Sequence, residues 1–173
     1  INYISPKLAN TVIRAAYSMG DERTSPPRDG GRVASVSAVF DNKSWVVGAF
    51  FLARRDLLAA GSAASGTTKF MGVAGRWNGP GFSIGAGASR WDPAGPDTAT
   101  MGVLTSWWLG ASYKAGASEF RAQAGRLRRS SPALVQPRAT LFGISYLYSL
   151  SRRTTLYATY GQMNNNEAAG FRL

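Results

Sequence analysis

The chain has 173 residues, 45% of them hydrophobic, and its 20 Lys and Arg against 9 Asp and Glu give a net charge of +11. It contains no Cys and no His, which excludes disulfide scaffolds, thiolate metal sites, Ser-His-Asp triads and HExxH zinc centres. The length suits one domain, and the apolar content is too high for a disordered chain. We therefore expect a folded domain that is not an enzyme and uses no cofactor.

No segment has the length and composition of a transmembrane helix. The longest stretch without charge, 98–113, contains several Ser, Thr and Gly and falls short of the about 20 apolar residues that span a bilayer. No signal peptide is visible at the start of the chain. Because Ile1 resembles the middle of a strand, we expect the chain to be a fragment.

The apolar residues recur instead at every second position, which is the period of a β-strand. In chain order the alternation covers 11–20, 33–40, 68–77, 82–89, 119–124 and 141–150. In the first segment Ile13, Ala15 and Tyr17 alternate with Arg14 and Ser18. Each segment thus has one continuous apolar face, whereas its other face is small, polar or arginine-bearing.

Short turns and longer polar connections alternate between these segments. The short turns lie at 6–10, 41–44, 78–81, 114–118 and 151–154, and the long connections at 21–31, 56–66, 92–99, 130–138 and from 164 onward. Long strands joined by short turns at one rim and long loops at the other are typical of transmembrane barrels. The pattern predicts an all-β fold, an antiparallel up-and-down transmembrane β-barrel with about ten strands in this chain.

Aromatic residues favour the same architecture, because membrane barrels carry aromatic girdles at their interfaces. The aromatic residues near the short turns, all on the apolar face, are Trp45, Trp77, Phe82, Tyr113, Phe120, Tyr146 and Tyr148. We interpret them as one girdle.

Several motifs resemble those of a known family. Tyr3-Ile4-Ser5-Pro6 is similar to a strand-end Y-x-S-P motif, and 146–158 is similar to a Y-x-L-S-K-R-T-x-L-Y hairpin, with Arg152 in place of the usual Lys. Asp41-Asn42 and 109–113 fit the same family's turn and strand patterns. The chain therefore resembles the general porins of Gram-negative outer membranes, of the β-proteobacterial type. The resemblance implies a water-filled channel for passive diffusion of small hydrophilic solutes, an outer-membrane location and a homotrimer.

The resemblance also implies that the chain is part of a larger barrel. Porins of this type look like barrels of about sixteen strands, and they end in an aromatic residue, whereas this chain ends at Phe171-Arg172-Leu173. We expect residues 1–173 to form a single partial β-barrel domain of central to C-terminal strands. The N-terminal strands, the constriction loop and the closing strand would then lie outside it.

The face opposite the apolar one is the expected wall of the channel. Its candidate pore-lining residues are Arg14, Arg54, Arg76, Arg121 and Glu119. Guanidinium groups stay charged and bind carboxylate or phosphate through forked hydrogen bonds. Several of them in a confined channel favour anions over cations, so we expect the channel to prefer anions.

A second group, Arg126, Arg128 and Arg129, flanks the loop 130–137 together with Arg138. We expect these arginines either to bind the phosphates of lipopolysaccharide, which with the lipid bilayer would be a partner of the protein, or to act as solubilising loop charge. Strict alternation puts Arg126 on the lipid side, which requires either a position at headgroup level or a bulge that shifts the register.

Two other functions remain open on the sequence alone. One is a small outer-membrane barrel without a channel, acting as an adhesin or structural anchor, since about ten strands can close. The other is a basic nucleic-acid-binding β protein. The basic residues are spread over loops and one strand face rather than gathered in one stripe, so we expect no nucleic acid partner.

Overall fold

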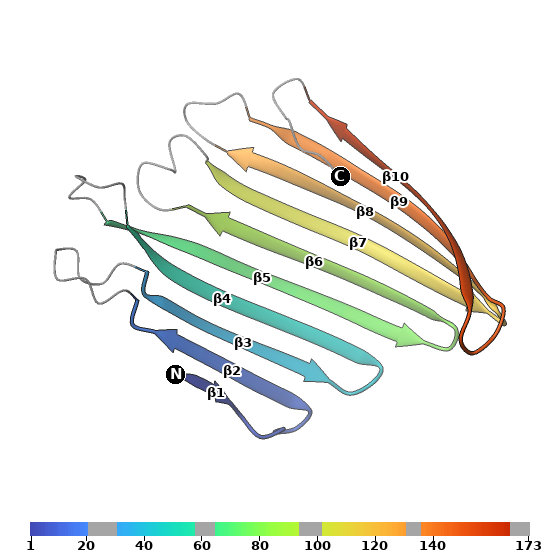
Figure 1. The fold of residues 1–173 in the computed structure, drawn as a ribbon, viewed down its shortest axis with the longest axis horizontal. Helices are drawn as coiled ribbons and strands as arrows, with labels where there is room; N and C mark the ends of the chain where they lie inside the picture. The colour runs from blue at the N-terminus through green and yellow to red at the C-terminus, as the bar shows by residue number, and fades with distance from the viewer. Residues whose placement is uncertain (21–30, 58–64, 94–101, 131–135, 167–173) are drawn as a thin grey trace.

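The computed structural model of the chain describes residues 1–20, 31–57, 65–93, 102–130 and 136–166, and it confirms the predicted all-β fold. The strands are β1 (Asn2–Ile4), β2 (Thr11–Ser18), β3 (Val33–Asp41), β4 (Trp45–Leu57), β5 (Ser65–Gly79), β6 (Phe82–Asp92), β7 (Val103–Ala115), β8 (Ser118–Ser130), β9 (Arg138–Ser149) and β10 (Thr155–Asn165). They form one antiparallel sheet of ten strands in the order β1 to β10 (Figure 1). Within these ranges the chain contains no helix long and apolar enough to cross a membrane.

The predicted short turns occur at one rim of the sheet, and the strand ends that the long connections join lie at the other (Figure 1). The greater part of those connections lies outside the described residues. At the turn before β4, Asp41 Oδ1 accepts a hydrogen bond from the Lys43 amide at 2.9 Å and Asn42 Oδ1 accepts one from the Trp45 amide at 2.7 Å. These are the local bonds by which Asp and Asn form turns. The turns before β6 and β8 use Gly81 and Gly116, whose φ angles of 77° and 60° suit glycine best.

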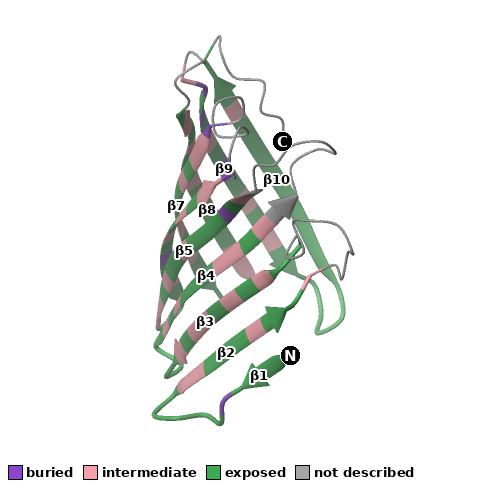
Figure 2. Ribbon diagram, turned by 90° about the vertical axis from the view of Figure 1, so that its left-hand side faces the viewer, coloured by how far each residue is buried: buried purple, intermediate pink, exposed green. Residues whose placement is uncertain are grey.

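Strand pairing assigns every strand residue to one of two faces, because residues directly opposite each other share a face. The face that contains Ile13, Val36, Phe51 and Val73 is named the outer face, and the opposite face is named the inner face. The sheet is curved rather than flat, and its strands show alternating bands of burial (Figure 2). In β6 the inner-face positions from Ser83 to Ser89 are the less exposed ones, as expected for side chains that converge on the concave side.

The wall is one layer thick, so no core lies between two packed layers. Among the described residues, Ala139 is the one buried hydrophobic residue, at 1% exposure, whereas Val73 and Leu109 on the outer face are 53% and 50% exposed. A large apolar face without a covering layer is unfavourable in water and suits a membrane barrel.

Candidate channel wall

All five predicted pore-lining residues lie on the inner face. Arg14 is opposite Ser37, Arg54 is opposite Thr68, and Arg76 is opposite Gly85. Arg121 and Glu119 are on β8, where Arg121 Nε donates a hydrogen bond to Glu119 Oε1 at 2.7 Å. The structure therefore brings Glu119 and Arg121 together, while it spreads the other three arginines over β2, β4 and β5.

The register adds further charged residues to the inner face that the sequence analysis did not place there. Lys114 is opposite Glu119, Arg129 is opposite Leu104, and Asp41 is opposite Val46. Among strand residues with described side chains, the inner face thus holds six cations and two carboxylates, an excess of four positive charges. Counting Asp56 as well, by its register position opposite Gly66, lowers the excess to three. The inner face is positive in either case.

Hydroxyl groups pair across neighbouring strands of the inner face. Ser83 and Ser112 are joined through their Oγ atoms at 2.9 Å, and Ser89 and Ser106 at 2.7 Å. Toward the other edge of the sheet, Thr159 Oγ1 donates to Ser145 Oγ at 3.1 Å. These pairs make the wall between the charged residues polar, which is compatible with contact with water.

The inner face also carries large aromatic residues, among them Trp108 and Phe50, where the sequence interpretation did not place a binding feature. Trp108 lies over Gly87 on β6, since a Cβ atom at Gly87 would be 2.6 Å from the indole Nε1. Phe50 lies over Gly72 on β5, where a Cβ atom would be 2.7 Å from Phe50 Cε1. Each ring therefore covers a glycine of the neighbouring strand, Phe50 from β4 over β5 and Trp108 from β7 over β6.

These rings border a groove of about 620 Å³, which also includes Arg76, Ser89 and Ser106. Trp108 is also close to Gly85, the residue opposite Arg76, so Trp108 and Arg76 border the same part of the groove. A ring held close to a glycine of the wall leaves more of the cross-section open than a ring that a larger residue displaces from the wall. A glycine opposite a large residue was the sequence signal that could have located these rings. It can be recognised only when the strand register is known.

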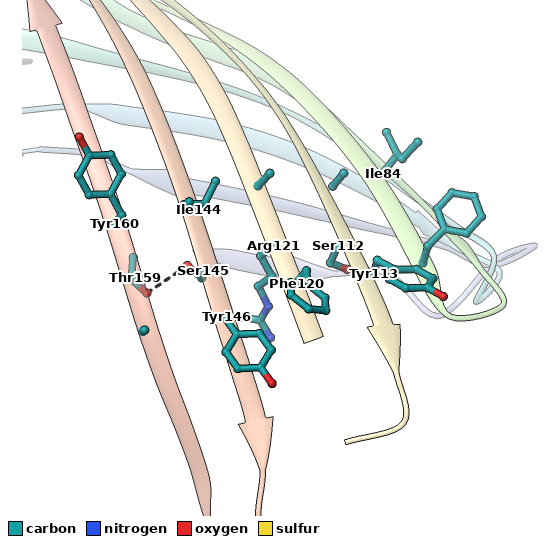
Figure 3. Close-up of a pocket in the computed structure, with 14 residues that line it drawn as sticks. Ile84, Ser112, Tyr113, Phe120, Arg121, Ile144, Ser145, Tyr146, Thr159 and Tyr160 are labelled. Atoms are coloured by element: carbon teal, nitrogen blue, oxygen red, sulfur yellow. Dashed lines mark hydrogen bonds between the residues drawn. The ribbon is translucent and has the colours of Figure 1, made fainter. Parts of the chain in front are cut away.

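The outer face carries the predicted aromatic girdle near the short-turn rim. Trp45 and Trp77 have ring centroids 6.3 Å apart, Trp77 and Phe82 are 4.8 Å apart, and Phe120 and Tyr146 are 5.0 Å apart. A groove of about 830 Å³ on this face is lined mainly by aromatic and aliphatic residues of β6 to β10 (Figure 3). Five of the seven girdle residues thus lie beside another ring of the girdle.

The second predicted group, Arg126, Arg128 and Arg129, does not share one face. Arg126 and Arg128 are opposite Trp107 and Thr105 on the outer face, whereas Arg129 lies on the inner face. Pairing of β7 with β8 continues without a break from Val103↔Ser130 to Ala115↔Ser118. No bulge therefore shifts the register at Arg126, and its outward position follows from strict alternation.

Comparison with known proteins agrees with this architecture. A family model described as Gram-negative porin matches residues 1–168, and no curated protein sequence matches significantly. An anion-selective porin from Comamonas acidovorans is similar in structure, with a TM-score of 0.78 and 17% identity over 97% of this chain and 49% of its own. OmpT, an outer membrane protein of Vibrio cholerae, has a TM-score of 0.69 and 16% identity over 95% of this chain and 53% of its own.

A third similar structure is OmpF of Salmonella typhi, in a complex with daunomycin, with a TM-score of 0.56 and 8% identity over 95% of this chain and 61% of its own. The chain thus spans about half the length of the first two proteins and somewhat more of the third. The chain forms ten up-and-down strands with a polar inner face and an apolar outer face, and the family model matches residues 1–168. Both observations lead to the same family. The chain belongs to the Gram-negative porin family of the outer membrane.

Proposed function

We propose that residues 1–173 form part of the wall of a water-filled outer-membrane channel through which small hydrophilic solutes, preferentially anions, diffuse passively. The observation that carries the anion preference is the positive excess of the inner face, six cations against two carboxylates among its described side chains. In a confined channel such an excess attracts anions and repels cations.

The two edges of the sheet support the proposal that this chain is a single partial barrel domain. β1 and β10 are the end strands of the sheet and each pairs with one neighbour. An open edge in hydrocarbon leaves backbone amides and carbonyls without partners, at several kcal/mol each. We propose that further strands of the complete protein pair with both edges, and that the constriction loop comes from those strands.

The porin from Comamonas acidovorans, described as anion-selective, shares this fold. At 17% identity it supports the architecture of the wall, while the anion preference of this chain rests on its own inner-face residues. The homotrimer and the lipopolysaccharide partner that the sequence led us to expect stay predictions for the complete protein.

The test is the reversal potential of the complete porin in a planar bilayer under a gradient of a neutral salt with similar cation and anion mobilities. We expect a sign that reports anion preference at low ionic strength and a smaller value at high ionic strength, because salt screens the wall charges. Cation preference at low salt would contradict the proposal, and the absence of any conductance would favour a barrel without a channel.

A further inference from the structure

The inner face contains a mainly apolar hollow within a wall that is otherwise polar and charged. This is the groove of about 620 Å³ described above, and we name it the inner groove. Its apolar lining includes Val39, Val46, Phe50, Ala74 and Trp108, and Arg76 is the one charged residue among its described lining residues. Apolar surface is unfavourable in water, so the inner groove offers a ligand a binding energy that the charged parts of the wall do not.

The strand register explains why the wall is hollow here. Gly48, Ala74 and Gly87 are opposite one another in turn on β4, β5 and β6, and they form a floor of small residues. Trp108 is opposite Gly87 at the end of this row. A Cβ atom would be 2.6 Å from the indole Nε1 at Gly87 and 3.4 Å from Cη2 at Gly85. The indole therefore borders the floor closely, yet 45% of Trp108 is exposed and available to a ligand.

The next row toward the long connections closes the inner groove with a second ring. Phe50 contacts the edge of Phe70, with ring centroids 4.8 Å apart and planes at 62°. In the same row Ser89 and Ser106 bond to each other through their Oγ atoms at 2.7 Å. The described lining residues include no carboxylate and no amide side chain. The inner groove thus has few groups for a ligand with many hydroxyls, such as a sugar.

The next row toward the short turns supplies the charge. Arg76 is opposite Val46 and Gly85, and no ion pair is recorded for it among the described residues. Asp41 is the carboxylate of this row, but β4 separates it from Arg76, and its Oδ1 accepts a hydrogen bond from the Lys43 amide at 2.9 Å. One guanidinium matches one carboxylate in a forked pair, whereas a phosphate dianion would keep an unbalanced charge.

We propose that the inner groove binds small aromatic carboxylates, with the ring on the floor beside Trp108 and the carboxylate at Arg76. The two rows are two residues apart along the strands, about 7 Å, which a molecule the size of benzoate and an arginine side chain together can span. Aromatic rings pair favourably in offset or edge-on arrangements. The proposal names a solute class for the proposed channel, and it rests on the placement of the inner face in the lumen.

The first test compares three probes on the native complete porin. Binding of benzoate, benzyl alcohol and acetate is measured in detergent by saturation-transfer difference NMR, with protein-free micelles as the blank. The salt is 0.15 M, where the Debye length of about 8 Å screens charges elsewhere on the wall. We expect benzoate to reach half-saturation at a concentration about fivefold lower than either probe that lacks the charge or the ring. Equal half-saturation of benzoate and acetate would overturn the proposal.

The second test uses variants of the two contacts. Trp108→Leu and Arg76→Gln should each raise the half-saturating concentration of benzoate about fivefold, because each removes one contact. Trp108→Phe keeps a ring and should stay within about twofold. The matched controls are Trp91→Leu and Lys114→Gln, which change inner-face residues outside the inner groove and should bind benzoate as the native protein does. Unchanged binding in Trp108→Leu and Arg76→Gln, or an equal loss in the controls, would overturn the proposal.

Two further measurements separate this inference from others. Displacement of benzoate by glucose at similar concentration would show that the site recognises sugars, and would overturn the assignment to aromatic carboxylates. The reversal potential of the native protein in a neutral salt tests the proposed ion preference without any aromatic solute. Anion preference without saturable benzoate binding would overturn this inference alone, whereas cation preference with intact benzoate binding would contradict the proposed ion preference alone.

Discussion

Replacing Arg14 and Arg76 with glutamine should lower the anion preference of the complete channel. Both arginines lie on the inner face, on β2 and β5, and no ion pair is recorded for either among the described side chains. Their charge is therefore available to ions in the lumen. Glutamine keeps much of the side-chain length and polarity, so the substitution removes charge with little change in the width of the channel.

The magnitude follows from Coulomb's law with salt screening. An ion about 10 Å from one guanidinium in water gains or loses ~0.4 kcal/mol before screening. At 0.01 M salt the Debye length of about 30 Å leaves ~0.3 kcal/mol, which changes the permeability of a monovalent anion and cation in opposite directions by about 1.7-fold each. The permeability ratio then changes roughly threefold per arginine and roughly eightfold for both. At 1 M salt, where the Debye length is about 3 Å, the ratio should change by only about 10%.

The Glu119–Arg121 pair provides a test of the sign. Glu119→Gln removes a negative charge next to Arg121 and should raise the anion preference by about the same threefold factor at low salt. Glu119→Gln/Arg121→Gln removes one charge of each sign, so its ratio should stay close to that of the native protein. The assay is the reversal potential at low and high ionic strength, with folding confirmed beforehand. Coincidence of the native protein and Arg14→Gln/Arg76→Gln at 0.01 M salt would refute the reasoning.

Three other predictions follow from the wall. Gly87→Ala should lower the single-channel conductance and cost about 1–3 kcal/mol in stability, because the new Cβ would lie 2.6 Å from Trp108 Nε1 and would displace the ring. Gly48→Ala is the control: its Cβ would lie 3.5 Å from the nearest atom, on Val39, so conductance and stability should not change. Ion preference that this wall contributes should be flat between about pH 5.5 and 8, since the chain has no His, and a sigmoidal change near neutral pH traced to residues 1–173 would contradict this. The 173-residue chain alone should not form a stable channel, because β1 and β10 have open edges; a stable unit conductance in a bilayer would disprove it.

Much of the fold was predictable because alternation and turn chemistry are local properties of a β-strand. The short turns at Asp41–Ser44 and Asn78–Gly81 set where β4 and β6 begin, and the apolar set that includes Ile13 and Tyr17 fixed the outer face of β2. The five predicted pore-lining residues lie on the inner face for the same reason. The sequence alone could not show that Glu119 bonds to Arg121, since that depends on side-chain conformation.

Features that depend on register between strands were missed. Trp108 on β7 is opposite Gly87 on β6 and Gly125 on β8, and these glycines leave room for its ring. Neither pairing is evident from the sequence of a single strand. Arg90 lies in line with Arg128 and Arg138 only when four strands are aligned. A one-residue change in register would move every side chain of a strand to the other face.

Arg128 and Arg129 are adjacent in sequence but lie on opposite faces of the sheet, because successive residues of a strand alternate between the two faces. They have the same side chain and adjacent positions on β8, yet Arg128 faces outward, opposite Thr105, and Arg129 faces inward, opposite Leu104. The first donates a hydrogen bond to Gln136 Oε1, and the second adds to the positive charge of the inner face. Grouping arginines by proximity in the sequence therefore combined two surfaces with different surroundings, one facing lipid and one facing the lumen in the proposed barrel. In a wall one layer thick, the position of a charge in the alternation decides which of the two surfaces it serves.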